Sequence, residues 1–135
     1  MSNFIKSYQA NVGLNHVPAY QVSGQPFATG SINAGTAVKV EFPYVTRWIY
    51  VINHTTDHCR VGFSQEGVEN GNFFRLSGET GNEATQFTQR LEVKVSEIWL
   101  SGSADVDVVA GLTSIPTSRV VTDSGPSWSG SAGVG

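Results

Sequence analysis

Residues 37–43 read Ala37-Val-Lys-Val-Glu-Phe-Pro43, and this stretch decides the fold class. Its apolar side chains fall at every second position and alternate with Lys39 and Glu41. Successive side chains of a β-strand point to opposite faces, so this alternation predicts a half-buried strand. The same period of two recurs in three further stretches, residues 59–64, 90–95 and 105–108. The pattern predicts an all-β domain.

Turn-forming Gly, Asn, Ser and Pro residues separate eight such segments. The predicted strands are Phe27–Ile32, Ala37–Pro43, Arg47–Asn53, Cys59–Ser64, Asn72–Leu76, Thr88–Val95, Glu97–Ser101 and Asp105–Thr113. Short strands at this spacing favour a sandwich or barrel, and eight strands in two sheets is the jelly-roll number. We therefore expect an eight-stranded single jelly-roll sandwich. An immunoglobulin-like sandwich is the alternative, but its Cys…Trp…Cys signature is absent.

Two flanking segments lie outside the predicted strands. We divide the chain into an extended N-terminal arm (residues 1–26), the jelly-roll domain (27–113) and a Gly/Ser-rich C-terminal tail (114–135). The composition of the tail is typical of a flexible linker. Trp128 is unusual in an idle linker, so we expect the tail to dock on a neighbouring protein, with docking on its own domain as the alternative.

Charge and composition exclude several classes of function. Charged residues make up 14% of the chain, against about 25% in an average soluble protein. The formal net charge is −3 and no basic run exists, so we expect no nucleic-acid binding. No stretch of about 20 apolar residues occurs and Met1–Ala10 is polar, so we expect neither membrane insertion nor a signal peptide. The low charge suits a cytosolic protein whose surface contacts other protein.

The densest polar cluster, residues 53–59, contains metal-capable side chains. They are His54, Asp57, His58 and Cys59, but their spacing fits no strong metal motif. We expect a solvent-facing polar loop with no metal, and Cys59 as a buried thiol. A cupin-like metalloenzyme using His54 and His58 is the weakest alternative. The glycosylation acceptor sequence Asn53-His54-Thr55 is expected to be idle.

The common nucleotide and hydrolase motifs are absent from the chain. Asp105 and Asp107 share one strand face, where they are expected to keep an edge strand solvated. We therefore expect no enzyme, no catalytic residue and no cofactor.

Several aromatic residues cannot all be placed inside, and aromatic residues are enriched at protein interfaces. Trp48, Tyr50 and Trp99 are expected to lie either in the core or in a lateral interface. Exposed aromatics such as Trp99 could also serve a carbohydrate-binding β-sandwich. The complete set of interface candidates is Tyr8, Tyr20, Trp48, Tyr50, Trp99 and Trp128.

The order of several motifs gives the chain a family resemblance. These are Asn15-His-Val-Pro-Ala-Tyr20, Phe42-Pro-Tyr-Val-Thr-Arg-Trp48, Asn72-Phe-Phe-Arg-Leu76, Glu97-Ile-Trp-Leu-Ser-Gly102 and Gly125-Pro-Ser-Trp-Ser-Gly130. In layout the chain resembles the single jelly-roll penton capsid proteins of large icosahedral double-stranded DNA viruses, chlorella-virus type.

This resemblance implies a structural role without catalytic residues. Five copies would close each vertex of the virion and contact the major and minor capsid proteins, after synthesis in the host cytoplasm. A minor capsid or cement protein of the same fold is the alternative within this class.

Overall fold

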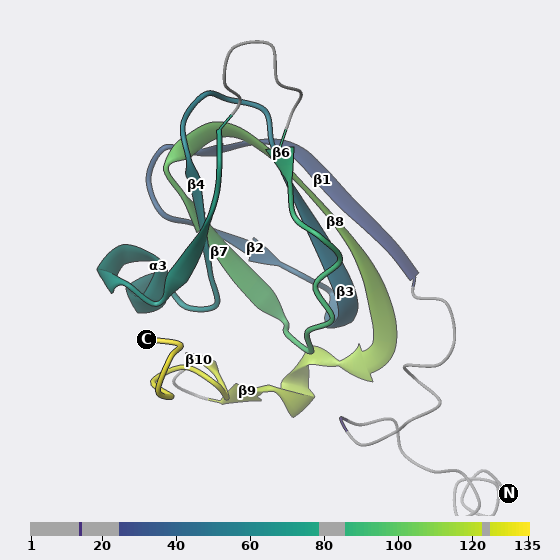
Figure 1. The fold of residues 1–135 in the computed structure, drawn as a ribbon. Helices are drawn as coiled ribbons and strands as arrows, with labels where there is room; N and C mark the ends of the chain where they lie inside the picture. Colours follow the sequence, from purple (N-terminus) through teal and green to yellow (C-terminus); the bar gives the residue numbers. More distant parts are fainter. Residues whose placement is uncertain (1–13, 15–24, 79–85, 123–124) are drawn as a thin grey trace, which may run out of the picture.

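A computed structural model describes Leu14 and residues 25–78, 86–122 and 125–135. These residues form two four-stranded antiparallel sheets that pack face to face around one core (Figure 1). The expected all-β class is confirmed. No helix among the described ranges has the length and apolarity needed to cross a membrane.

The two sheets interleave strands that are distant in the chain. The first has the order β1 (Gln25–Ala34), β8 (Ser103–Pro116), β3 (Tyr44–Asn53) and β6 (Gln86–Phe87). The second has the order β2 (Val38–Glu41), β7 (Glu97–Ser101), β4 (Cys59–Gly62) and β5 (Phe73–Leu76). The first strand pairs with the eighth, the second with the seventh, the third with the sixth and the fourth with the fifth. In both sheets, each of the first four strands therefore pairs only with strands from the second four.

The predicted alternation places the core correctly. On β8, Val106, Val108 and Ala110 are fully buried, whereas Asp105 and Asp107 lie on the outer face. Ile49 and Val51 of β3 are likewise fully buried. Side chains from both sheets meet in this core, so burial of apolar surface holds the layers together.

The predicted strand Thr88–Val95 is wrong as a regular strand. Strand β6 covers only Gln86–Phe87, and a single isolated bridge joins Leu91 to Ile49. Backbone bonds to β3 remain at Thr88, Leu91 and Val95, and side-chain hydroxyls replace others along this segment. Thr46 Oγ1 donates to Val93 O at 2.6 Å and accepts from Val95 N at 3.1 Å. The Thr46 hydroxyl therefore occupies the Val93 carbonyl and the Val95 N–H that a regular ladder would pair with backbone groups.

A short helix, α3 (Gln65–Asn70), replaces the turns expected after β4. Strand β4 ends at Gly62, two residues before its predicted end. Ser64 then caps the helix, because its Oγ accepts the Gly67 N–H at 2.9 Å. The helix ends at Gly71, whose φ of +124° favours glycine.

The C-terminal segment folds back onto its own sandwich. Beyond β8 it forms a 3-10 turn, η1 (Thr117–Arg119), and a small hairpin of β9 (Val121–Thr122) and β10 (Gly125–Pro126). Trp128 packs between the main core and a second cluster of Val45, Ile115 and Val120. Its Nε1 donates to Phe63 O at 2.8 Å, and Ser64 Oγ donates to Val134 O at 2.8 Å. Part of the predicted tail therefore belongs to the packed domain.

Candidate functional site: an aromatic sheet face and a polar groove

The outer face of the first sheet carries two of the predicted interface residues. Trp48 and Tyr50 alternate with the buried core residues of β3, so they point away from the core, and both are half-buried. Their rings meet edge to face with centroids 5.6 Å apart. The Trp48 indole lies over Gly111, where an added Cβ would collide with it. The absence of a side chain at Gly111 thus lets the indole lie close against the sheet.

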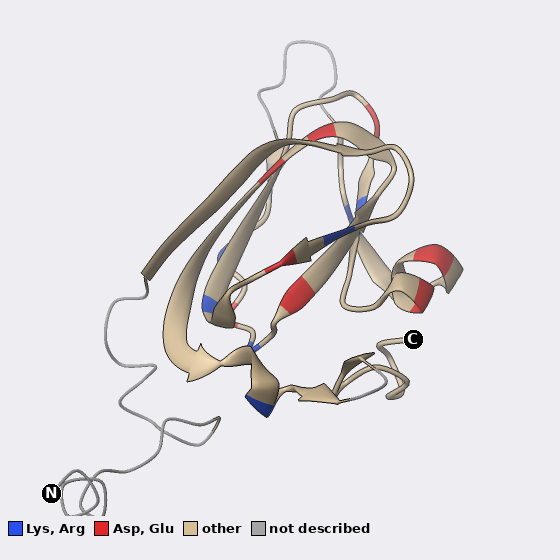
Figure 2. Ribbon diagram, turned by 180° about the vertical axis from the view of Figure 1, so that it is seen from behind, with Lys and Arg blue, Asp and Glu red and all other residues tan. Residues whose placement is uncertain are grey.

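Few charges interrupt this aromatic face. Strand β1 contains no charged residue, and Figure 2 shows that charged residues are sparse over the described part of the ribbon. The two carboxylates on the outer face of β8, Asp105 and Asp107, lie toward one end of the strand. An uncharged surface binds water weakly, so the free-energy cost of removing water when a partner covers this face is small.

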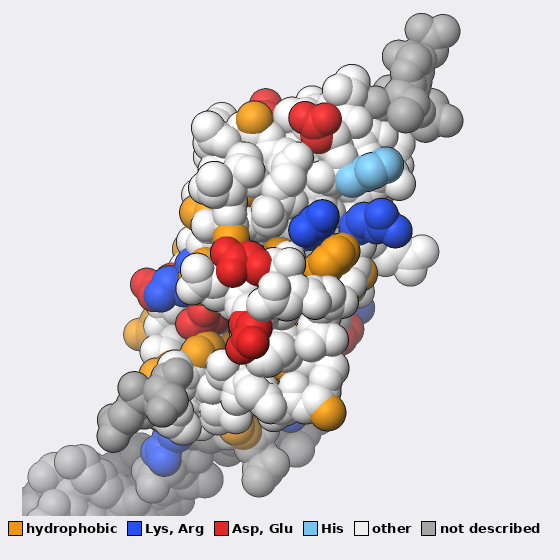
Figure 3. All heavy atoms as spheres, turned by 90° about the vertical axis from the view of Figure 1, so that its left-hand side faces the viewer, with side chains coloured by type: hydrophobic (Ala, Val, Ile, Leu, Met, Phe, Trp, Pro, Cys, Tyr) orange, Lys and Arg blue, Asp and Glu red, His pale blue; other side chains and the backbone are white. Residues whose placement is uncertain are grey.

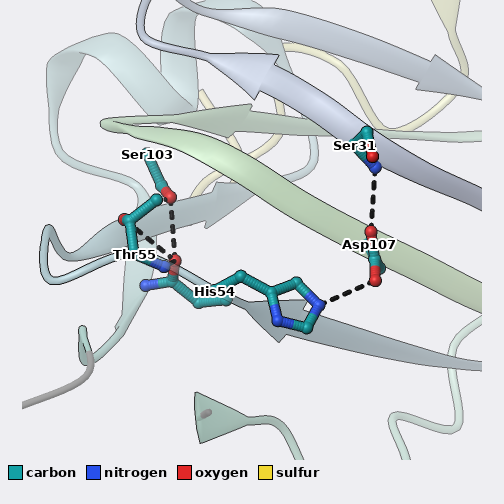
Figure 4. Close-up of polar contacts among 6 residues, drawn as sticks. Ser31, His54, Thr55, Ser103 and Asp107 are labelled. Atoms are coloured by element: carbon teal, nitrogen blue, oxygen red, sulfur yellow. Dashed lines mark hydrogen bonds and ion pairs between the residues drawn. The ribbon is translucent and has the colours of Figure 1, made fainter.

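The end of that sheet carries a polar cluster centred on Asp107 (Figure 4). Asp107 Oδ2 lies 2.7 Å from His54 Nε2, and Asp107 Oδ1 accepts the Ser31 N–H at 2.9 Å. The Ser31 N–H lowers the pKa of the Asp107 carboxyl, and the hydrogen bond from His54 lowers it further. Ser31 has a positive φ of 54° at an irregularity in β1, so the carboxylate fixes a strained bend.

The metal-capable residues of the polar loop do not converge. His54 points to Asp107, whereas His58 Nδ1 accepts the Gly78 N–H at 3.2 Å. Cys59 is fully buried as predicted, and burial raises the pKa of its thiol to about 11. No group of three metal-ligating side chains occurs among the described residues.

Asn53 forms a buried polar hub that the sequence pattern missed. Its side chain is fully buried, with Nδ2 donating to Asp57 O at 2.7 Å and Oδ1 accepting from Ser103 Oγ at 2.8 Å. Thr55 N–H also donates to Oδ1, at 3.2 Å. Asn53 therefore holds the loop after β3 in place, and its buried Nδ2 leaves no room for a glycan in the folded domain.

The remaining predicted interface residues either lie away from the aromatic face of the first sheet or fall outside the described residues. Trp99 lies on the outer face of the second sheet, half-buried, with its Nε1 donating to Glu97 Oε2 at 2.6 Å. Trp128 contacts its own domain in this single chain. Tyr8 and Tyr20 lie outside the described residues.

A polar groove beside Trp99 was not predicted. It lies between α3, the outer face of β2 and β7, and the β9–β10 hairpin. Lys39 on its floor pairs with Glu41 at 2.6 Å, and this hydrogen bond raises the pKa of the Lys39 ammonium. Figure 3, which views the side that carries α3, shows acidic side chains gathered near the middle of this face.

Comparison with known proteins adds no identification. No family model matches the chain, and searches of curated proteins and solved structures returned no significant match. The architecture defines it as an all-β protein of two antiparallel sheets.

Proposed function

We propose that this chain is a single jelly-roll capsid protein that forms homopentamers at the vertices of an icosahedral virion. The nested pairing of the eight strands supports the jelly-roll assignment, because a rolled hairpin produces this interleaved order in two sheets. The proposed partners are further copies of the chain and the surrounding major and minor capsid proteins.

The observation that carries the proposal is the aromatic outer face of the first sheet. Trp48 and Tyr50 stand there on a surface whose edge strand has no charge. Aromatic residues with little surrounding charge are typical of the centre of a protein interface. Monomeric proteins usually protect a long edge strand such as β1 with charged residues. An uncharged edge is consistent with coverage by another subunit.

The second sheet offers a chemically different surface for the other side of such a contact. Arg60 lies over the Phe73 ring, with its guanidinium carbon 4.7 Å from the centroid, and Arg75 is its cross-strand neighbour. The first sheet instead carries Asp105 and Asp107 on its outer face. Contact between two unlike patches is heterologous, and it closes a ring when the rotation between neighbours is suitable.

Native mass spectrometry of the full chain tests the proposal. Five copies of the 14.4 kDa chain give a 72 kDa ring. Ala28→Arg places a charge on the exposed part of β1 and should abolish the ring, whereas Ser118→Arg, on the exposed η1 turn, should leave it intact. A protein that stays monomeric both alone and with major capsid protein would refute the assignment.

A further inference from the structure

The groove beside Trp99 has a floor and two walls that come from distant parts of the chain. Its volume is about 520 Å³, within the range of ligand sites in proteins. The outer face of β2 and β7 forms the floor, with Lys39, Glu97 and Trp99. The first wall is α3 with the residue before it, and the second is the C-terminal segment. The first wall contributes Gln65, Glu66, Glu69 and Asn70, and the second contributes Gly125 and Pro126.

Packing contacts hold each wall in place. Gly62 pairs with Trp99 across β4 and β7, and a Cβ on Gly62 would lie 3.1 Å from Val68 Cβ. Helix α3 therefore rests directly on the strand next to the indole. On the opposite side, the hydrogen bonds from Trp128 to Phe63 and from Ser64 to Val134 fasten the C-terminal segment. The groove is thus formed before any ligand arrives.

The Trp99 indole is oriented by its own neighbour. The 2.6 Å hydrogen bond from Nε1 to Glu97 Oε2 fixes the ring while leaving it partly exposed in the groove. A ring held in this way needs little further ordering when a ligand packs on it, so more of the contact energy appears as affinity. The indole offers a flat apolar surface inside an otherwise polar site.

The polar lining contains both donors and acceptors. The carboxylates of Glu66 and Glu69 accept, the Lys39 ammonium donates, and the amides of Gln65 and Asn70 do both. An anionic ligand would face three glutamates against one lysine. The three glutamates would attract a cationic ligand, but such a ligand would leave the N–H donors of Lys39, Gln65 and Asn70 unmatched. Hydroxyl groups donate and accept, so a polyhydroxyl ligand can use the whole lining.

We propose that this groove binds a neutral oligosaccharide, with one sugar ring stacked on Trp99 and its hydroxyls bonded to the polar side chains of α3. A sugar ring combines an apolar C–H face with a rim of hydroxyls, which matches the indole and its polar surroundings. The site lies over β2 and β7, away from the aromatic face of the first sheet. Glycan binding therefore does not require ring formation, and either activity can fail without the other.

A glycan array that carries neutral, sialylated and sulfated oligosaccharides tests the ligand class with the full chain. We expect signals from neutral glycans alone. Titration calorimetry with the strongest neutral oligosaccharide should then show that Trp99→Ala raises Kd by at least about tenfold. Phe74→Ala, which removes an exposed aromatic of β5 outside the groove, should leave Kd unchanged.

Replacing the glutamate carboxylates by amides of the same shape distinguishes binding of a neutral sugar from binding of a cation. The double change Glu66→Gln and Glu69→Gln keeps acceptors at both positions and should alter Kd for a neutral sugar by less than about threefold. Nα-acetyl-arginine methyl ester serves as the cationic probe and should not bind. Circular dichroism and thermal unfolding check that each variant is folded. No neutral glycan binding, binding unchanged in folded Trp99→Ala, or preferential binding of the arginine ester would each overturn the proposal.

Discussion

Replacing Asn53 by alanine should cause a large loss of stability, because this side chain links three segments of the chain from a fully buried position. It connects the end of β3 to the loop carbonyl of Asp57 and to the start of β8 through Ser103. A weaker bond reaches Ser77 O at 3.3 Å, just after β5. The neighbouring Thr55 hydroxyl reaches the Asp57 carbonyl only at 3.4 Å, so it replaces the shorter Asn53 bond in part.

The size of the loss follows from which groups remain unpaired. Ser103 Oγ keeps a partner, because Thr55 Oγ1 lies 2.7 Å away. The N–H of Thr55 loses its partner, and the carbonyl of Asp57 keeps only the longer 3.4 Å bond from Thr55 Oγ1. Each partly buried group left unpaired costs about 1–3 kcal/mol, so we expect a total of about 3 kcal/mol. With a urea m-value of about 1.5 kcal/mol/M, the unfolding midpoint should fall by about 2 M.

Urea denaturation followed by tryptophan fluorescence measures this shift. Asn33→Ala is the matched control: Asn33 is exposed and its Oδ1 accepts the local Gly35 N–H at 3.0 Å, so its midpoint should move by less than about 0.5 M. The isosteric Asn53→Asp adds a pH test. A carboxylate facing the Asp57 carbonyl would have a raised pKa, so the variant should lose stability as pH rises above about 4 and recover toward lower pH. An unfolding midpoint for Asn53→Ala within about 0.5 M of the parent, the range expected for the control, would refute a stabilising role for the Asn53 hydrogen bonds.

Three further predictions concern the tail, the thiol and the polar cluster. Trp128→Ala should lower the free energy of unfolding by about 2 kcal/mol, because a half-buried indole and its hydrogen bond to Phe63 are lost. The loosened C-terminal segment should also be cleaved faster by trypsin at Arg119. Equal cleavage rates in parent and variant would contradict docking of the tail. Cys59, fully buried with a pKa near 11, should react with a disulfide reagent at pH 8 only after unfolding, and rapid labelling of the folded chain would disprove its burial. Asp107→Asn should cost less than about 1 kcal/mol at pH 7, because the pair with His54 is about one-third exposed. Because the pKa of Asp107 is lowered in the folded state, its contribution to the free energy of unfolding is fully present above about pH 4 and is lost as the pH falls through the folded-state pKa. The stabilities of parent and variant should therefore converge at low pH. A stability difference that stays constant with pH would contradict this coupling.

The alternation of apolar and polar residues determined most of the strands by itself. Glu97–Ser101 was predicted with its observed bounds, and the inward positions of β8 were also correct. This succeeds because a strand at the surface of a core must expose every second side chain, whatever its partners are. The same pattern correctly placed Cys59 inside.

Only the tertiary structure decided features that depend on residues far apart in the chain. The segment 88–95 alternates like a strand, yet the Thr46 hydroxyl, 47 residues before Val93, interrupts its ladder. The groove beside Trp99 exists because α3 and the C-terminal segment meet over the second sheet, and no local pattern records that meeting. Periodicity reports which face of an element is buried, because that depends on the element alone. The neighbour that covers each face is set by how the whole chain packs.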